Sequence, residues 1–380
     1  MLDSGGIPSY HLGDEGARRI PMAKLKISCP GCRRTLLCEE KYRDQDVRCP
    51  HCHLLFPVPN TPLPRVANQR RHRHRHRGRN KLIIAGVLAA LLLLLASIGL
   101  LFTRPTDFQW TDHRPIGVLF LASNGHISAT NPRGWFNDDR LDVTGTNGPA
   151  RFRQALMEFT DRSIDILKRT GAQGVIVWDL EGQEYPHKTS YIGDPRLLER
   201  LAPEMAPVAD EFFSRLRSAG FKVGVTIRPQ QLVFSDSGLP QQTQVTDIKQ
   251  TLLNKIDYAR AHWGATLFYV DSNGGIRRPD EVWQLRSLMK ARPDVLLIPE
   301  HCYLPYRAFS APYVDLKQQP DTTASWSRKL FPGSFQAVDI SDASPDSITA
   351  AWLQGDIILF RAWYWTSECQ LLEGLEHPAK

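Results

Sequence analysis

The chain has 380 residues, 42% of them hydrophobic and 9% aromatic, so it is long enough and apolar enough to bury a sizeable core. Its net charge is +7, but the excess is uneven: the first 81 residues hold 17 basic and 7 acidic side chains, and the remainder carries a net of −3. This concentration makes a general nucleic-acid-binding function the weaker interpretation of the charge.

Four cysteines dominate the N-terminal part of the chain. Residues 1–26 show no hydrophobic period, and we expect them to be disordered. Two C-x2-C pairs follow, separated by sixteen residues, a spacing typical of a tetrathiolate zinc site: Cys29, Cys32, Cys49 and Cys52. A disulfide pair or a redox motif is the alternative, and the paired spacing disfavours both.

This cysteine pattern resembles the prokaryotic zinc-ribbon family over residues 27–58. The segment is too short to fold on its own core, so binding of a structural Zn²⁺ would supply the folding free energy. Ribbons of this kind usually dock to a protein or a nucleic acid, and the sequence identifies neither partner.

An apolar run at residues 82–102 contains 21 residues without a charge or a proline. At about 1.5 Å per residue, a helix of this length spans about 30 Å, which is the thickness of the hydrocarbon core of a bilayer. We therefore predict a transmembrane helix. A buried core helix and a cleaved signal peptide fit less well.

The preceding Pro-, His- and Arg-rich linker, 59–81, has five arginines between residues 71 and 79, and positive flanks stay in the cytoplasm. We therefore expect a single-pass protein of the cytoplasmic membrane, with its N-terminus inside and residues 103–380 outside.

Residues 103–380 alternate between apolar β-rich runs and helical patterns, as parallel strands joined by crossovers do. Eight strands are predicted, at 116–121, 175–179, 222–227, 266–271, 295–299, 313–316, 335–340 and 357–362. Helices are predicted between them at 152–169, 195–219, 245–262 and 279–291. Eight such units predict a (β/α)8 TIM barrel, with an open doubly wound sheet as the runner-up.

The residues that end these strands carry the predicted chemistry, because active sites of such barrels lie at the carboxyl ends of the strands. They are rich in carboxylates and aromatic rings and poor in cations, which suits a neutral carbohydrate. No H-x-H pair and no phosphate-binding loop occurs in this part of the sequence, so a metal-dependent hydrolase and a phosphorylated substrate are disfavoured.

The barrel sequence resembles glycoside hydrolases, and more closely an uncharacterised membrane-anchored group with WDLEGQEY at the second strand and YVDSNG at the fourth. It is distantly similar to the melibiase-type α-galactosidases. That resemblance implies Asp271 as nucleophile and Asp315 as acid/base. Tyr269 departs from the family, which usually has a lysine two residues before the nucleophile.

From these residues we predict hydrolysis of O-glycosidic bonds of a carbohydrate, with Asp271 as nucleophile or base and Glu300 or Asp315 as proton donor. The predicted substrate-binding residues are Trp178, Asp179, Glu181, Tyr185, Arg228, Asn273, Tyr303 and Asp339. No cofactor is needed for this reaction. Two other functions fit the sequence: a glycan-binding pseudoenzyme, and a membrane adaptor whose zinc ribbon is the active part and whose barrel is a sensor.

Overall fold

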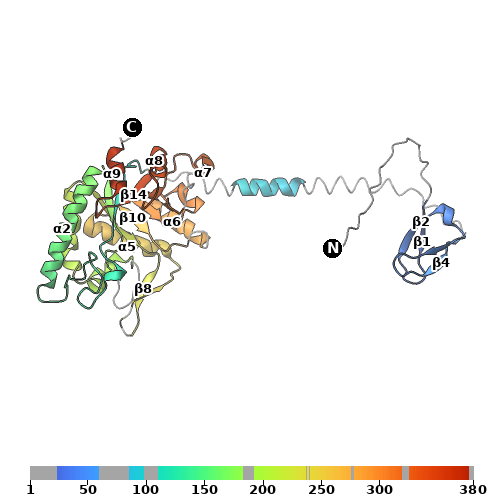
Figure 1. Ribbon diagram of the computed structural model, residues 1–380, viewed down its shortest axis with the longest axis horizontal. Helices are drawn as coiled ribbons and strands as arrows, with labels where there is room; N and C mark the ends of the chain where they lie inside the picture. The colour runs from blue at the N-terminus through green and yellow to red at the C-terminus, as the bar shows by residue number, and fades with distance from the viewer. Residues whose placement is uncertain are drawn as a thin grey trace, which may run out of the picture. The chain divides into compact units, whose positions relative to one another are not determined.

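The computed structural model describes residues 24–59, 85–97, 110–182, 192–236, 238, 240–274, 278–318 and 325–375. The chain divides into two compact units, Met1–Ala89 and Ala90–Lys380, and each is described by itself (Figure 1). Most of the predicted disordered N-terminus, the linker from residue 60 onward and Tyr185 lie outside the described residues.

Two antiparallel hairpins form the N-terminal unit. One pairs β1 (Lys24–Ser28) with β2 (Thr35–Glu39), and the other pairs β3 (Asp46–Arg48) with β4 (Leu55–Pro57). A 3₁₀ turn, η1 (Glu40–Tyr42), follows β2. The hydrophobic cluster of this unit has five buried members: Ile27, Cys29, Cys49, Phe56 and Val58. Because so small a core contributes little stability, the hairpins need a further link to hold them together.

Residues 85–97 are helical and lie inside the apolar run at 82–102. Their apolar side chains are exposed; Leu93, for example, retains 69% of its accessible surface. In the part of the chain that the structure describes, no helix combines the length and the apolarity needed to cross a membrane. The ends of the run, at 82–84 and 98–102, lie outside that part.

Eight parallel strands form the centre of the C-terminal unit, one in each predicted β-rich run. They are β5 (Ile116–Leu119), β6 (Gly174–Val177), β7 (Lys222–Ile227), β10 (Leu267–Val270), β11 (Leu296–Pro299), β12 (Tyr313–Asp315), β13 (Ala337–Asp339) and β14 (Ile357–Arg361). Their spatial order is β11-β10-β7-β6-β5-β14-β13-β12, so the last strand of the chain pairs with the first. This nearly closed ring fits a (β/α)8 barrel, and its order is not that of a doubly wound sheet.

The ring is interrupted between β11 and β12. No strand ladder joins these two strands, although a backbone hydrogen bond from Ala311 N to Leu297 O, 3.1 Å long, crosses the gap. The connection between them contains η6 (Leu304–Ala308), a 3₁₀ helix, where the other crossovers have an α-helix. The barrel is therefore least regular beside the strand end that carries Glu300.

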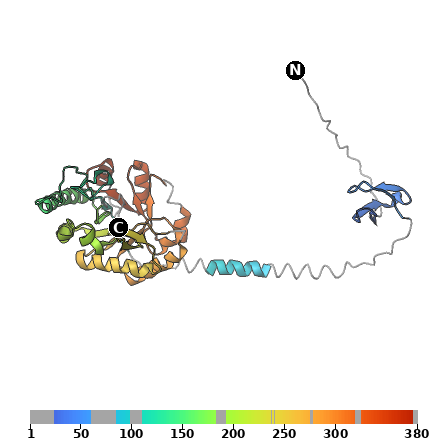
Figure 2. The same ribbon diagram turned by 90° about the horizontal axis from the view of Figure 1, so that it is seen from below.

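The helices lie on the outside of the sheet, with α2 and α6 on opposite flanks (Figures 1 and 2). The α-helices are α2 (Gly148–Arg169), α3 (Leu198–Leu201), α4 (Ala209–Ser218), α5 (Ile248–Trp263), α6 (Pro279–Ala291), α7 (Ser325–Leu330), α8 (Pro345–Leu353) and α9 (Ser367–Gly374). Shorter 3₁₀ helices are η2 (Asn124–His126), η3 (Pro195–Leu197) and η4 (Ala206–Val208).

Two features of this part differ from the sequence prediction. The single helix expected at 195–219 is broken into η3, α3, η4 and α4, because Pro203 and Pro207 interrupt helical hydrogen bonding. An antiparallel hairpin, β8 (Gln231–Phe234) with β9 (Pro240–Thr243), follows β7 and was not predicted.

Alternate residues of each barrel strand pack into two separate cores. Inside the barrel lie residues such as Val118, Ile176 and Leu267, and their strand neighbours Val177 and Phe268 pack outward against the helices. Side chains thus alternate between the barrel interior and the helical layer. This alternation decides which strand-end residues reach the candidate site.

Candidate active site and cysteine cluster

A cavity of about 450 Å³ lies at the carboxyl ends of the barrel strands. Seven of the eight strands, or the turns directly after them, contribute to its wall, and β7 does not. Its volume is within the range of about 300–1,000 Å³ that is usual for ligand-binding cavities. Four carboxylates from the predicted site residues line it together: Asp271, Glu300, Asp315 and Asp339.

Strand register brings these four acids together as two pairs. Val270 of β10 is paired with Pro299 of β11, so Asp271 and Glu300 follow side by side on adjacent strands. Neighbouring strands lie about 4.8 Å apart, which places the two carboxylates on one side of the cavity. Asp315 of β12 is the register partner of Asp339 of β13.

Asp271 is paired with a cation that does not itself line the cavity. Arg228, directly after β7, forms a hydrogen-bonded salt bridge with Asp271 Oδ2. The side chains retain only 10% and 7% of their accessible surface, so the guanidinium compensates a charge that water cannot solvate freely. Arg228 therefore acts on the site through Asp271.

Glu300 lies in a different electrostatic environment. Burial raises the pKa of its carboxyl above the usual value, and the negative charge of Asp271 raises it further. Ser272 N donates a 2.7 Å hydrogen bond to Glu300 Oε2, and Ser272 has a left-handed φ of 57°. The strained turn after Asp271 thus aims a backbone donor at the neighbouring acid.

Asp339 and Asp315 accept hydrogen bonds from the turns around them. Asp339 Oδ2 accepts from the Tyr313 hydroxyl at 2.9 Å, and its Oδ1 accepts from Ser341 N at 2.9 Å. Asp315 Oδ1 accepts from the backbone of Lys317, and its Oδ2 accepts from the Gln318 side chain at 2.7 Å. Both carboxylates are fixed in orientation while remaining part of the cavity wall.

Aromatic rings form another part of the wall. The ring of Trp178 lies 4.1 Å from that of Tyr269 and 5.5 Å from that of Phe120, centroid to centroid. Tyr313 packs edge-on against Tyr269 at 5.4 Å. Trp178 and Tyr269 are 6% and 3% exposed, so these rings pack mainly on one another and make this part of the wall apolar.

Two of the predicted binding residues point away from the cavity. Asp179 is fully buried, and its two oxygens accept hydrogen bonds from Leu121 N and Ala122 N at 2.7 and 2.8 Å. Glu181 is 2% exposed and accepts from Asp194 N at 2.8 Å. Burial raises the pKa of each carboxyl to about 7. Both residues hold backbone segments in place through these hydrogen bonds.

Asn273 and Tyr303 also lie outside the cavity wall. The Asn273 amide donates to the hydroxyl of Tyr306 at 3.0 Å, and the half-buried Tyr303 packs against the same ring. The predicted catalytic and substrate-binding residues did not include several residues that do line the wall: Phe120, Tyr269, His301, Cys302, Tyr313 and Arg361. Tyr269 could have been found, because it lies two residues before Asp271 on the same face of β10.

The four cysteines of the N-terminal unit lie in two similar turns. In one, Arg33 N donates to Cys29 O at 2.8 Å, and in the other His53 N donates to Cys49 O at 2.9 Å. Arg33 and His53 share a left-handed backbone, with φ of 55° and 60°. This repeated geometry presents two sulfurs from each turn.

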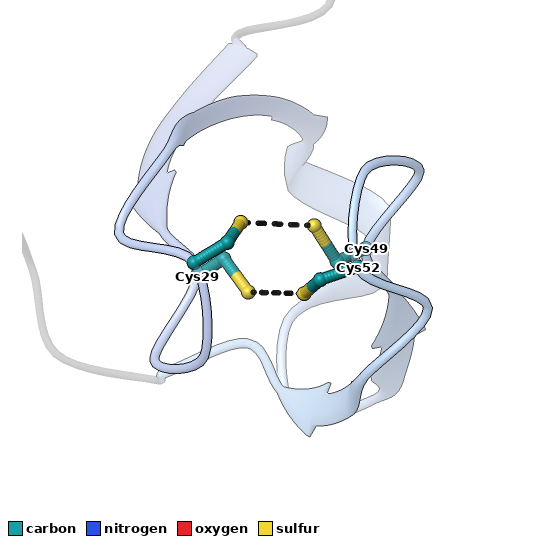
Figure 3. Close-up of side chains that lie close together, drawn as sticks. Cys29, Cys49 and Cys52 are labelled. Carbon is teal, nitrogen blue, oxygen red and sulfur yellow. Dashed lines mark hydrogen bonds between the residues drawn. The ribbon is translucent and has the colours of Figure 1, made fainter.

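All four sulfurs lie within 4.8 Å of one another. The separations across the turns are 3.5 Å for Cys29 and Cys52 and 3.7 Å for Cys32 and Cys49. Figure 3 shows Cys29 facing Cys49 and Cys52 from the opposite turn. Although burial opposes ionisation of Cys49, backbone N–H groups of Cys52 and His51 lower the pKa of its thiol to about 6. A tetrahedral ion with bonds of about 2.3 Å requires sulfurs about 3.8 Å apart, so this cluster could bind one metal ion.

Comparisons with known proteins give distant structural matches only. No protein-family model and no curated protein sequence matches the chain. Among solved structures, an α-amylase from Geobacillus thermoleovorans complexed with acarbose has a TM-score of 0.43 and 11% identity over 66% of this chain and 70% of that one. An Anoxybacillus α-amylase has a TM-score of 0.41 and 10% identity over 70% and 77%. The galactosidase domain of an α-galactosidase-sucrose kinase has a TM-score of 0.35 and 12% identity over 58% of this chain and 37% of that one. At this level of similarity the matches carry no argument about the reaction.

Proposed function

We propose that the C-terminal unit is a glycoside hydrolase that uses Asp271 and Glu300 as its two catalytic carboxyl groups. The observation that carries this proposal is that the two acids share one cavity wall in unlike surroundings. Arg228 compensates the charge of Asp271, whereas burial and the nearby Asp271 favour the protonated form of Glu300. Glycoside hydrolysis needs one ionised and one protonated carboxyl group on either side of the bond to be cleaved.

In the proposed reaction, Glu300 gives its proton to the glycosidic oxygen as the bond from that oxygen to the anomeric carbon breaks. Asp271 attacks the anomeric carbon, or removes a proton from a water molecule that attacks it. Trp178 and Tyr269 would form an apolar wall beside the sugar, and Asp339 would accept hydrogen bonds from its hydroxyl groups. Asp315 is the second candidate for the proton donor, since it lines the same cavity.

The test is hydrolysis of a panel of aryl glycosides by the full-length protein and by Asp271→Asn. We expect the wild type to cleave at least one aryl glycoside and the variant to lose about 10³-fold or more in kcat, because the amide neither attacks carbon nor accepts a proton. Unchanged turnover in the variant would remove Asp271 from the reaction. Carbohydrate binding without any hydrolysis by the wild type would identify a glycan-binding pseudoenzyme instead.

We also propose that the cysteine cluster holds a structural Zn²⁺ and that residues 82–102 anchor the chain in the cytoplasmic membrane, with the barrel outside. The sulfur separations support the first part, since they suit a tetrahedral ion of this size. The exposed apolar side chains of residues 85–97 support the second, because such a surface is unfavourable in water. The ribbon would then be free in the cytoplasm to bind a protein or a nucleic acid.

A further inference from the structure

A lysine is buried on the inner face of α5, among apolar residues of the same helix. Lys255 is 1% exposed, and Leu252, Ile256 and Ala259 beside it are buried as well. Burial lowers the pKa of Lys255 to about 8, which reflects the cost of removing an ammonium group from water. A side chain in this position needs strong partners, because a buried charge without them is strongly destabilising.

The partners of Lys255 are three backbone carbonyl groups. Its Nζ donates to the oxygens of Gly193, Arg228 and Gln230 at 3.1, 2.8 and 2.8 Å. An ammonium group has three N–H donors, so these three bonds use all of them. The carboxylate of Asp194, at 3.5 Å from Nζ, compensates the charge.

These contacts hold two segments against each other. Gly193 belongs to the loop after β6, and its carbonyl also accepts from Arg228 N at 3.0 Å. A side chain at position 193 would come within 2.8 Å of that nitrogen, and the φ of +66° favours glycine there. Asp194 N is held in turn by Glu181. The loop and the end of β7 are therefore packed backbone to backbone.

Arg228 and Gln230, which follow β7, also reach the two proposed catalytic acids through their side chains. Arg228 is paired with Asp271, and Gln230 Nε2 donates to Ser272 O at 3.0 Å. Ser272 N donates in turn to Glu300. Hydrogen bonds, joined through the covalent structure of Arg228 and Gln230, thus link the Lys255 ammonium to both acids, although Lys255 does not line the cavity.

We propose that Lys255 is a positioning residue for the Asp271 and Glu300 pair. Its ammonium fixes the carbonyls of Arg228 and Gln230, and this fixes the directions in which their side chains meet the turn at 271–272. The expected effect on kcat rests on the proposed hydrolase activity. The expected effect on the position of the turn at 271–272 does not. A misplacement of about 1 Å at reacting groups can reduce a rate about 100-fold.

The test compares full-length Lys255→Met with the matched variant Lys249→Met, in which a half-buried lysine of the same helix is changed. The first measurement is kcat and KM on the aryl glycoside that the wild type cleaves fastest. The second is hydrogen–deuterium exchange of peptides covering residues 226–232 and 270–274. For K255M we expect kcat to fall about 100-fold with KM little changed, since the cavity wall is intact, and faster exchange in both peptides. K249M should match the wild type in both measurements.

Because K255M removes one donor from each of three carbonyls, Lys255→Gln is made alongside it and decides the question if K255M does not fold. The Gln amide keeps two N–H donors, so we expect a smaller fall in kcat and a smaller increase in exchange. Wild-type kcat or wild-type exchange in a folded variant would overturn the proposal, as would a loss of kcat that only follows the unfolded fraction seen by circular dichroism. If the wild type cleaves no glycoside, the proposed function fails, and the exchange measurement still decides whether Lys255 positions the turn.

Discussion

Glu300 is a half-buried acid of the cavity wall that lies beside a second acid, Asp271. Burial and the charge of Asp271 both favour its protonated form. Arg228 forms its salt bridge with Asp271, so the two acids lie in unlike electrostatic surroundings. In the proposed reaction, this difference would make Glu300 the acid and Asp271 the nucleophile or base.

This assignment predicts a leaving-group dependence for Glu300→Gln. The variant should lose about 10²–10⁴-fold in kcat on substrates whose leaving group needs a proton, and much less on a 2,4-dinitrophenyl glycoside, which leaves without one. In the wild type, kcat should decrease as pH rises through the raised pKa of Glu300, and this decrease should be absent from the variant. Asp315→Asn is the matched comparison, and selective loss there instead would make Asp315 the donor.

Asp179 makes stability depend on pH in the opposite sense to an ion-paired aspartate. Its pKa is about 7 in the folded protein because of burial, against an ordinary value of 3.8. Between these values the folded state binds the extra proton, so the contribution is fully present below about pH 4 and is lost as pH rises to 7. We expect the free energy of unfolding in urea to decrease over this range, and to do so less steeply in Asp179→Asn. Equal slopes in both proteins would contradict the assignment.

Among the elements, the paired turns of the N-terminal unit depend most on a single link. Each turn is held by its own backbone hydrogen bonds, but the buried cluster that joins the two hairpins is small. A metal bound by all four cysteines would supply the missing stability. Removing one ligand should then affect both hairpins at once.

We therefore expect Cys32→Ser to lose the metal and to unfold the ribbon. Metal analysis should find about one Zn²⁺ per chain in the wild type and little in the variant, with fast amide exchange throughout residues 24–59. Cys38→Ser is the control, because the Cys38 sulfur lies outside the cluster and contacts Glu39 O. Zinc retained by C32S, or lost equally from C38S, would argue against a four-cysteine site.

The barrel strands were predicted more accurately than the helix at 195–219. Each predicted run contains an observed strand, since apolar β-rich stretches separated by helical patterns mark parallel strands. The broken helix at 195–208 was misjudged because two prolines lie within an otherwise continuous apolar period. At this scale composition and spacing predict the strands well, and the errors are the helix broken by prolines and the unpredicted hairpin of β8 and β9.

For the whole molecule, the proposed anchor makes a prediction about the two ends of the chain. A periplasmic-type reporter, alkaline phosphatase, should be active when fused after Lys380 and inactive when fused after Val58, because the basic flank stays in the cytoplasm. Carbonate washing should leave the full chain in the membrane pellet and release a variant lacking residues 82–102. The reverse reporter pattern, or extraction of the full chain, would contradict the topology.

The sequence by itself determined the cysteine spacing, the eight strands and the presence of acids at their ends, because each of these is a local pattern. It could not determine that Trp178 points into the barrel and Asp179 away from it. Strands of a parallel sheet are buried on both faces, so their apolar runs carry no sign of which side faces inward. Only the tertiary structure decided which residues of each strand face inward. Only it brought Arg228 to Asp271, and Lys255 to the backbone carbonyl of Arg228. Those contacts join residues far apart in the chain, and their formation depends on how strands and helices pack.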